Sequence, residues 1–237
     1  MIISYSKSLI YKIIKKFGYN IVKNQISFDN IYKKNFNGNI IIFDVGANTG
    51  QSIRRFNSIF PKSIIHSFEP IKMCYEKICL NYPSNNFIKN NFALSNKIQN
   101  KNFFFNKFSP SSSFLQIKKK YSKLEKGFKK KNFITKTMTL DAYINFHKIK
   151  KIDILKIDTQ GHELMVLKGG KNILKKSIIN FIEIEVIFAD LYKNKTPYLY
   201  ELDFFLNKNN FGFYSIEDFN YDSLNRVRWC NLLYKKN

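Results

Sequence analysis

The feature that most constrains the fold of this chain is a short apolar run that ends in a glycine-containing turn. Residues 40–43 read Ile-Ile-Ile-Phe and are followed by Asp-Val-Gly-Ala-Asn-Thr-Gly at 44–50. An apolar run of this length predicts a strand buried on both faces. Residues 51–60 place apolar side chains on one face of a helix, which Pro61 ends. A buried strand, a tight turn and a helix are typical of a parallel α/β sheet, in which ligands bind beyond the carboxyl ends of the strands.

The same alternation of strand and helix continues along the chain. It predicts strands at 63–68, 86–89, 152–157, 178–186, 213–216 and 229–234, and helices at 71–80, 140–147, 163–174 and 197–207. Gly169-Gly170 is expected to interrupt one of these helices, and the last two strands are expected to pair as an antiparallel edge hairpin. The alternation breaks at 98–138, which we interpret as an insertion: a hairpin with strands at 103–105 and 133–138 around a lysine-rich loop.

Residues 1–38 are interpreted as a basic, initially helical lead-in to a single α/β domain at 39–237. Residues 1–22 have the spacing of an amphipathic helix, but lysines interrupt its apolar residues, so it does not predict a bilayer span. Two interpretations stay open: this helix packs on its own domain, or it lies on an anionic membrane surface. The three cysteines, none in a C-x-x-C pair, predict neither a disulfide framework nor a zinc site and fit a reducing cytoplasm. We expect a cytoplasmic protein, with peripheral contact at the inner face of the membrane under the second interpretation.

The net charge of +23 also admits two interpretations. Such a charge is typical of proteins that bind phosphate-rich partners or anionic membranes. However, only four of the 40 basic residues are arginines, and the abundant lysine, asparagine, isoleucine and phenylalanine all have AT-rich codons. A nucleic-acid-binding protein is expected to use more arginine, which contacts phosphate and guanine with two donors. Compositional drift is therefore the favoured explanation, and no nucleic-acid partner is expected.

The side chains around the turn favour a positively charged ligand over a phosphate. A nicotinamide-type loop reads G-x-G-x-x-G, whereas Asn48 stands at the middle glycine position and the third glycine is missing. Asp44, just before the loop, repels phosphate and attracts an ammonium or sulfonium group. Gly46 permits the tight turn, and Gly50 permits close approach of the backbone to a ligand. Glu69 lies 19 residues beyond Gly50 (69 − 50), at the predicted end of the second strand, where a carboxylate accepts hydrogen bonds from ribose hydroxyls.

These segments resemble those of the FkbM family of methyltransferases. The resemblance covers about residues 40–234 and is carried by Phe43 to Gln51, Phe68-Glu69-Pro70, Asn91 to Ser95, Ser111-Ser112-Ser113, Thr139-Leu140-Asp141, Leu155 to Glu163 and Glu185 to Tyr192. It implies a class I methyltransferase (Rossmann-like) α/β fold: a seven-stranded, mostly parallel sheet with helices on both faces and an antiparallel last strand. It also implies S-adenosyl-L-methionine as the cofactor and O-methylation of small molecules, often sugars of cell-surface glycans.

The resemblance further implies roles for residues around the cofactor. It places Asp44, Gly46, Asn48 and Gly50 around the methionine part, Glu69 at the ribose, and Asn91 and Ala93 near the adenine. The sequence departs from the family at 231–234, which lack an expected aspartate, and at the lysine-rich loop 118–131. Both departures bear on the acceptor rather than on the cofactor.

Methyl transfer to a hydroxyl needs the oxygen held about 3 Å from the methyl carbon and a base for its proton. The candidate catalytic residues are Asp158 at the end of the central strand, His162 four residues on, and Glu185 at the end of the neighbouring strand. Each has a structural alternative: Asp158 caps the next helix, His162 sits in its first turn, and Glu185 is one of several acids that pair with Lys156. Tyr192 is expected either to line the acceptor pocket or only to pack. No spacing matches a metal-ligand set, so no metal is predicted.

The sequence therefore predicts an S-adenosylmethionine-dependent O-methyltransferase that acts on a small-molecule hydroxyl, a sugar in surface glycan or polysaccharide biosynthesis. Two alternatives remain. The charge suggests an RNA methyltransferase, whose binding would depend strongly on salt. Residues 1–22 and the lysine-rich loop suggest a non-catalytic, membrane-associated protein with the same fold.

Overall fold

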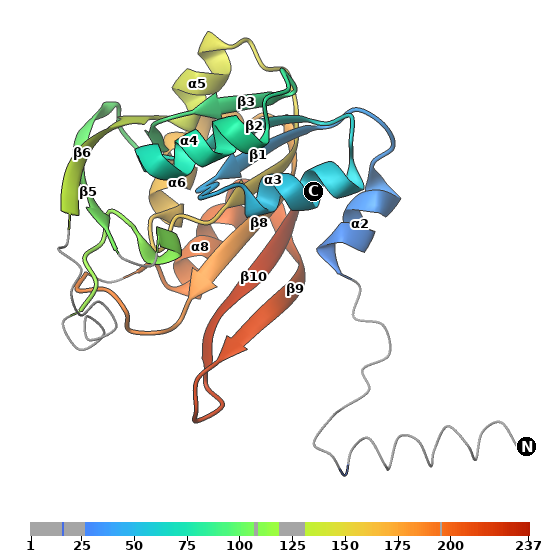
Figure 1. The fold of residues 1–237 in the computed structure, drawn as a ribbon. Coiled ribbons are helices and arrows are strands. Elements are labelled where there is room, and N and C mark those ends of the chain that lie inside the picture. The colour runs from blue at the N-terminus through green and yellow to red at the C-terminus, as the bar shows by residue number, and fades with distance from the viewer. Residues whose placement is uncertain (1–15, 17–26, 107–108, 119–130, 195) are drawn as a thin grey trace, which may run out of the picture.

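A computed structural model of the chain describes residues 16, 27–106, 109–118, 131–194 and 196–237. Its centre is a seven-stranded sheet in the order β3-β2-β1-β7-β8-β10-β9 (Figure 1). In that order the strands are Phe87–Asn90, Ile64–Phe68, Ile41–Val45, Ile152–Ile157, Ile179–Ile187, Val227–Lys236 and Phe211–Tyr221. The first five are mutually parallel, and β10 is antiparallel to both β8 and β9. The predicted sheet, its antiparallel last strand and its edge hairpin are confirmed.

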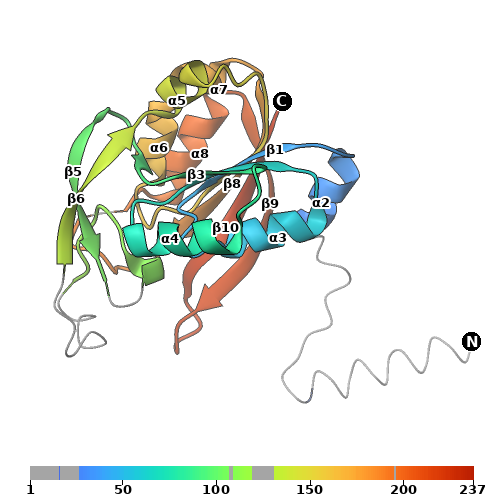
Figure 2. The ribbon, with the colours of Figure 1, turned by 45° about the horizontal axis from the view of Figure 1, so that its top comes forward.

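Helices cover both faces of this sheet (Figure 2). One face carries α2 (Phe28–Asn35), α3 (Gln51–Ile59) and α4 (Lys72–Asn81), and the other carries α5 (Leu140–Phe146), α6 (Glu163–Gly169), α7 (Lys171–Lys175) and α8 (Leu199–Asn207). Two apolar cores result, one on each face. Every residue of β7 is buried, because a strand covered on both sides cannot alternate between core and solvent.

Helix α2 belongs to one of these cores, although the sequence predicts a lead-in up to residue 38. Ser27 caps the helix by accepting a hydrogen bond from the backbone N–H of Asn30, and Phe28, Ile31 and Tyr32 are buried against α3 and the sheet. Eight residues carry too little periodicity to reveal this face in the sequence. The packed unit thus includes α2. Apart from Lys16, the predicted helix at 1–22 lies outside the described residues.

The insertion at 98–138 and the residues just before it form a small second sheet beside the first. Its strands are β4 (Ala93–Leu94), β5 (Gln99–Phe105) and β6 (Lys131–Met138), in the order β4-β6-β5. Strands β5 and β6 are antiparallel, with Gln99 opposite Thr137, which confirms the predicted hairpin. The lysine-rich loop between them lies mostly outside the described residues. A β-bridge between Ile117 and Tyr192 ties the segment after β5 to the loop that follows β8.

Glycines set two boundaries in the second half of the domain. The predicted 163–174 helix is interrupted as expected, because α6 ends at Gly169 and α7 begins after Gly170. A Cβ at Gly169 would lie 2.1 Å from the carbonyl oxygen of Ser95, so only glycine allows α6 to meet this chain so closely. The glycine pair therefore reflects close packing as well as a helix end.

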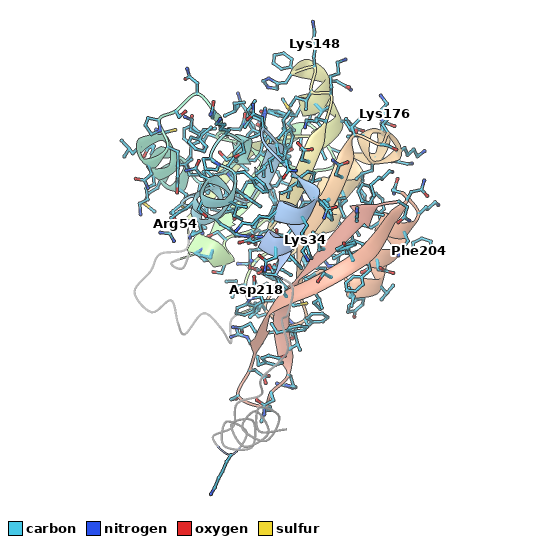
Figure 3. All side chains as sticks on the ribbon, turned by 90° about the vertical axis from the view of Figure 1, so that its right-hand side faces the viewer. Lys34, Arg54, Lys148, Lys176, Phe204 and Asp218 are labelled. Carbon is cyan, nitrogen blue, oxygen red and sulfur yellow. The ribbon has the colours of Figure 1, made fainter. Side chains whose placement is uncertain are left out.

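The labelled lysines are exposed side chains in three separate parts of the chain: Lys34 on α2, Lys148 in the turn after α5 and Lys176 in the turn after α7 (Figure 3). Their separation indicates that part of the positive charge is spread over solvated surface. No helix among the described residues has the length and apolar character needed to cross a membrane.

Candidate active site

A cavity of about 900 Å³ opens beyond the carboxyl ends of β1, β2, β7 and β8. The loop after β1 and the end of β2 form one side, and the ends of β7 and β8 form its floor. The insertion contributes Phe103, Phe114 and the 110–112 segment as a wall, and Trp229 of β10 lines the far side. This volume lies at the upper end of the range for small-molecule sites. A cavity therefore lies at the strand ends, where the sequence predicts the ligand-binding site.

The loop after β1 brings backbone up to this cavity. Gly46 has φ +90°, and a Cβ there would lie 1.9 Å from the carbonyl oxygen of Asp158, so no other residue fits without moving β7. Asn48 has φ +47° and also lines the cavity. Gly50, by contrast, lies behind the lining, where a Cβ would meet the Tyr82 ring at 2.6 Å. Gly50 therefore shapes the start of α3 rather than the cavity surface.

Asp44 is completely buried just beneath this loop. Among the described residues neither of its carboxylate oxygens accepts a hydrogen bond, and the nearest cation is the Lys156 ammonium, 3.8 Å away. Burial raises the pKa of Asp44 to about 6, against the opposing charge of Lys156. This buried carboxylate has unused acceptor positions, which suit a positively charged ligand, but it does not itself line the cavity, whose surface at this point begins with Val45 and Gly46.

Glu69 is the cavity's best-anchored acid. Its Oε2 accepts from the backbone N–H of Asn48 at 2.8 Å, and its Oε1 accepts from the N–H of Ile71 at 2.7 Å. Burial raises its pKa to about 8, although these two hydrogen bonds oppose the rise. Each carboxylate oxygen accepts more than one hydrogen bond, so Glu69 retains acceptor capacity toward the cavity that it lines.

The two residues predicted near the adenine separate in the structure. Ala93 is buried and lines the cavity. Asn91 is exposed and is not part of the lining, because its amide group donates to the backbone carbonyls of Glu69 (2.9 Å) and Pro70 (3.3 Å). The Asn91 side chain therefore braces the turn after β2, and its place near the adenine stays a prediction.

Asp158 and Glu185 meet at the cavity floor through Gln160. The Gln160 Nε2 donates to Asp158 Oδ1 at 3.1 Å and also to Glu185 Oε2. Lys156 Nζ donates to the other Asp158 oxygen at 3.2 Å, and the Tyr192 hydroxyl donates to Gln160 Oε1 at 3.0 Å. Burial and the negative charge of Asp158 raise the pKa of Glu185 well above its ordinary value. The side chain of Asp158 is 34% exposed, so this carboxylate is accessible from the cavity.

His162 lies outside this group. Its ring is buried, contacts the Phe114 ring at 4.5 Å between centroids, and exchanges a 2.9 Å hydrogen bond with Ser95. Burial lowers its pKa to about 3, with a smaller contribution from the Lys101 charge, so the imidazole is neutral at physiological pH. The side chain thus lies in the packing between the insertion and α6, away from Asp158 and Glu185, and its catalytic role stays a prediction.

Tyr192 is also absent from the cavity lining. Its side chain is buried, and its hydroxyl lies within hydrogen-bonding distance of the Ser111 carbonyl and the Gln160 side chain. Its place is therefore behind Gln160, which favours the packing alternative, and a role in the acceptor pocket stays a prediction. Gln160 itself was not singled out from the sequence, although it lies within the 155–163 segment; its φ of +56° turns the side chain back toward the two carboxylates.

Two further acids, Glu163 and Glu183, stabilise neighbouring segments and do not line the cavity. Glu163 accepts hydrogen bonds from the backbone N–H groups of Thr159 (2.9 Å) and Gly161 (3.0 Å), so it fixes the loop after β7. Glu183 accepts from both terminal nitrogens of Arg55 at 2.7 and 3.0 Å and from the Tyr32 hydroxyl at 2.8 Å. Glu183 is thus satisfied without Lys156, which leaves the Lys156 charge for Asp44 and Asp158.

The donor set fits the cofactor that the sequence implies. The orphaned Asp44 carboxylate matches a positive charge, and the Gly46 turn leaves space that a Cβ would fill. Asn48 and Glu69 continue this surface toward β2. When bound, S-adenosylmethionine would supply an electrophilic methyl group to an acceptor in the cavity. Among the described residues no group of three or more His, Cys, Asp or Glu side chains is arranged to hold a metal ion.

The sequence relatives of this chain are methyltransferases. The 2-O-methyltransferase NoeI of Sinorhizobium fredii strain NGR234 is 27% identical over 165 residues, which are 66% of this chain and 67% of the relative. Among solved structures, M. capricolum TrmK in complex with S-adenosyl-homocysteine has 14% identity and a TM-score of 0.45, covering 90% of this chain and 70% of that one. An rRNA methylase from Streptococcus thermophilus has 10% identity and a TM-score of 0.48, covering 92% and 99%. The family described as "Methyltransferase FkbM domain" matches residues 44–213, most of the chain. The chain belongs to the FkbM family of methyltransferases, with S-adenosylmethionine as its methyl donor.

Proposed function

We propose that this methyltransferase methylates a hydroxyl oxygen of a sugar during the assembly of a surface glycan. The observation that carries the proposal is the pair of carboxylates, Asp158 and Glu185, at the floor of the cavity and next to the cofactor loop. A hydroxyl nucleophile must lose its proton, and a carboxylate pair of this kind accepts one. The relative NoeI, whose name describes 2-O-methylation, supports an oxygen acceptor.

In this proposal the carboxylate pair acts as the base. Asp158 and Glu185 both accept hydrogen bonds from the Gln160 amide, so two carboxylates lie side by side where a proton from the acceptor hydroxyl can be received. The raised pKa of Glu185 makes the pair a stronger base than an isolated glutamate in water. Lys156 holds Asp158 in place through a hydrogen bond to its other oxygen. Gln160 fixes the spacing of the two acids.

The cofactor contacts are proposed along the opposite side of the cavity. Asp44 and the backbone at Gly46 and Asn48 receive the methionine part, Glu69 receives the ribose hydroxyls, and Ala93 lies beside the adenine. The support is the orphaned Asp44 carboxylate, the acceptor capacity of Glu69 and their order along the strand ends.

The test is methyl transfer from labelled S-adenosylmethionine to a panel of methyl glycosides and surface polysaccharides, with the methylated atom located by NMR. Asp158→Asn combined with Glu185→Gln is expected to lower kcat by at least about 100-fold, since general base catalysis contributes at this scale. Cofactor affinity is expected to change little. Asp203→Asn, a matched substitution on α8 whose carboxylate accepts from Tyr234, serves as the control. Methylation at nitrogen, or full activity in the double variant, would contradict the proposal.

A further inference from the structure

Arg228 occupies the side of the cavity farthest from the cofactor loop. The loop follows β1, whereas Arg228 belongs to β10, and β7 and β8 lie between them. Three inter-strand spacings of about 4.8 Å separate β1 from β10 by about 14 Å. The Asp158 and Glu185 carboxylates end the two strands in between. A group bound at Arg228 therefore lies across the proposed base from the cofactor, which is the acceptor side.

The backbone of β10 turns the Arg228 side chain into this cavity. The pairing of β10 with β9 is irregular between Val227 and Trp229 and again between Trp229 and Asn231. Such bulges re-aim side chains, and here two successive residues, Arg228 and Trp229, both line the cavity. The Arg228 carbonyl accepts from the N–H groups of Phe188 (2.8 Å) and Ala189 (3.0 Å), which anchors the bulge to the end of β8.

The Arg228 guanidinium is held in place, yet no carboxylate among the described residues pairs with it. It lies over the Trp229 ring, with 4.8 Å between its central carbon and the ring centroid. Arg55 and Arg226 differ, because each binds a carboxylate, Glu183 and Asp222 respectively. Among the described residues that line the cavity, Arg228 is the one with a positive charge. Its planar set of donors is suited to a carboxylate, sulfate or phosphate.

We propose that Arg228 and Trp229 form an acceptor subsite that binds an anionic group on, or next to, the sugar that receives the methyl group. The Trp229 ring offers an apolar face to the sugar, and the guanidinium pairs with the anion. This inference rests on the proposed function and narrows it to acidic or phosphorylated sugars. The net charge of +23 raises the local concentration of such anions around the protein.

The chain provides its own probe for this subsite, because Trp229 is its single tryptophan. The experiment titrates the full chain, saturated with S-adenosyl-homocysteine, with glucuronate, glucose 1-phosphate, glucose and inorganic phosphate, and follows tryptophan fluorescence. Saturable changes are expected with glucuronate or glucose 1-phosphate at lower concentration than with glucose. The stronger of the two acidic sugars identifies a carboxylate or a phosphate as the preferred anion. Inorganic phosphate alone is expected to bind more weakly, because it lacks the sugar ring.

Arg228→Gln is expected to weaken binding of the acidic sugar by about 10- to 100-fold, the scale of a hydrogen-bonded charge pair. Arg228→Lys is expected to restore part of the affinity, since it keeps the charge without the planar fork. Arg226→Gln, two residues away and paired with Asp222 in the hairpin, is the matched control and is expected to bind like the wild type. Cofactor affinity is measured in parallel for all three variants.

Three results would overturn the inference. If the wild type bound glucose as tightly as both acidic sugars, the subsite would not recognise an anion. Equal loss of glucose and acidic-sugar binding in Arg228→Gln would indicate a role in packing alone. Loss of cofactor affinity in that variant would assign Arg228 to the cofactor carboxylate instead. Because fluorescence measures binding without turnover, failure of sugar methylation would contradict the proposed function separately.

Discussion

Replacing Asp44 by asparagine is expected to stabilise the ligand-free protein while weakening its hold on the cofactor. Burial raises the Asp44 pKa from its ordinary value of 3.8 to about 6, so keeping this group charged in the folded state is unfavourable. At about 1.36 kcal/mol for each tenfold change in an acidity constant, the difference amounts to about 3 kcal/mol. Asparagine has nearly the same shape and carries no charge, so the variant avoids this cost.

The sign of the pH dependence follows from the direction of the pKa change. Because the pKa is higher in the folded protein than in the unfolded chain, the folded state holds the proton more tightly. The Asp44 contribution to wild-type stability is therefore most favourable below 3.8 and is lost as the pH rises to about 6. The advantage of Asp44→Asn is expected to be about 3 kcal/mol at pH values above that window and to fall to about 0.5 kcal/mol near the ordinary pKa.

The assay is thermal and urea unfolding of both proteins, each without ligand, in a series of buffers. In the neutral range, about 3 kcal/mol corresponds to a Tm increase of about 6–12 °C for a chain of this size. The matched control is Asp153→Asn, also on the sheet, whose carboxylate accepts from the Ile41 N–H and from Lys151 and Asn180. Asp153→Asn is expected to lower the free energy of unfolding by about 1–3 kcal/mol, because the Asp153 carboxylate is hydrogen-bonded in the wild type.

Binding provides the second half of the same test. Saturating S-adenosylmethionine is expected to raise the wild-type Tm more than that of Asp44→Asn, since ligand affinity adds directly to stability. A hydrogen-bonded charge pair is worth about 1.5–3 kcal/mol, or about 10- to 100-fold in Kd. The reasoning is refuted if Asp44→Asn is less stable than the wild type at neutral pH, or if its advantage does not shrink on acidification.

Three other substitutions test the remaining structure. Gly46→Ala is expected to abolish cofactor binding, because its Cβ would meet a carbonyl oxygen at 1.9 Å; Gly38→Ala, with a similar φ and open space, is the control and is expected to lose only about 1–2 kcal/mol of stability. His162→Gln is expected to leave the shape of the pH profile of kcat/KM unchanged, because burial lowers the pKa of this imidazole to about 3, outside the working range. If one arm of the wild-type pH profile disappeared in this variant, the result would support His162 as the base. Arg55→Met is expected to lower the free energy of unfolding, measured in urea, by about 3–5 kcal/mol, since it leaves the Glu183 carboxylate buried without its cation; a change below about 1 kcal/mol would show that the pair is not a core support.

Much of the cofactor side was predictable from short stretches of sequence. The apolar run at 40–43 requires burial on both faces, and the glycines after it require a turn, so the strand–turn–helix unit depends on local chemistry. Glu69 was found in the same way, because a strand end places it at the same edge as the loop. Helix α2 was missed, since its eight residues gain their helical state from packing of Phe28 and Tyr32 in the core.

The catalytic side was only partly predictable. Asp158 and Glu185 come together because β7 and β8 are neighbours, as the strand pattern suggests. The position of His162, packed on Phe114 and Ser95 instead of lining the cavity, follows a loop in which Gln160 and Gly161 both have positive φ values. Sequence spacing gives no access to such a backbone conformation at a non-glycine residue.

The sequence by itself thus determined the class of fold, the cofactor loop and the acids that end the strands, because each follows from patterns within a few residues. Only the tertiary structure decided which polar groups face the cavity. The Tyr192 hydroxyl, the Gln160 amide and the Arg228 guanidinium take their positions from contacts between segments that are far apart in the chain. The sequence pattern of a strand indicates which of its residues are buried. The direction of each side chain depends on the neighbouring strands and on bulges, and long-range packing determines both.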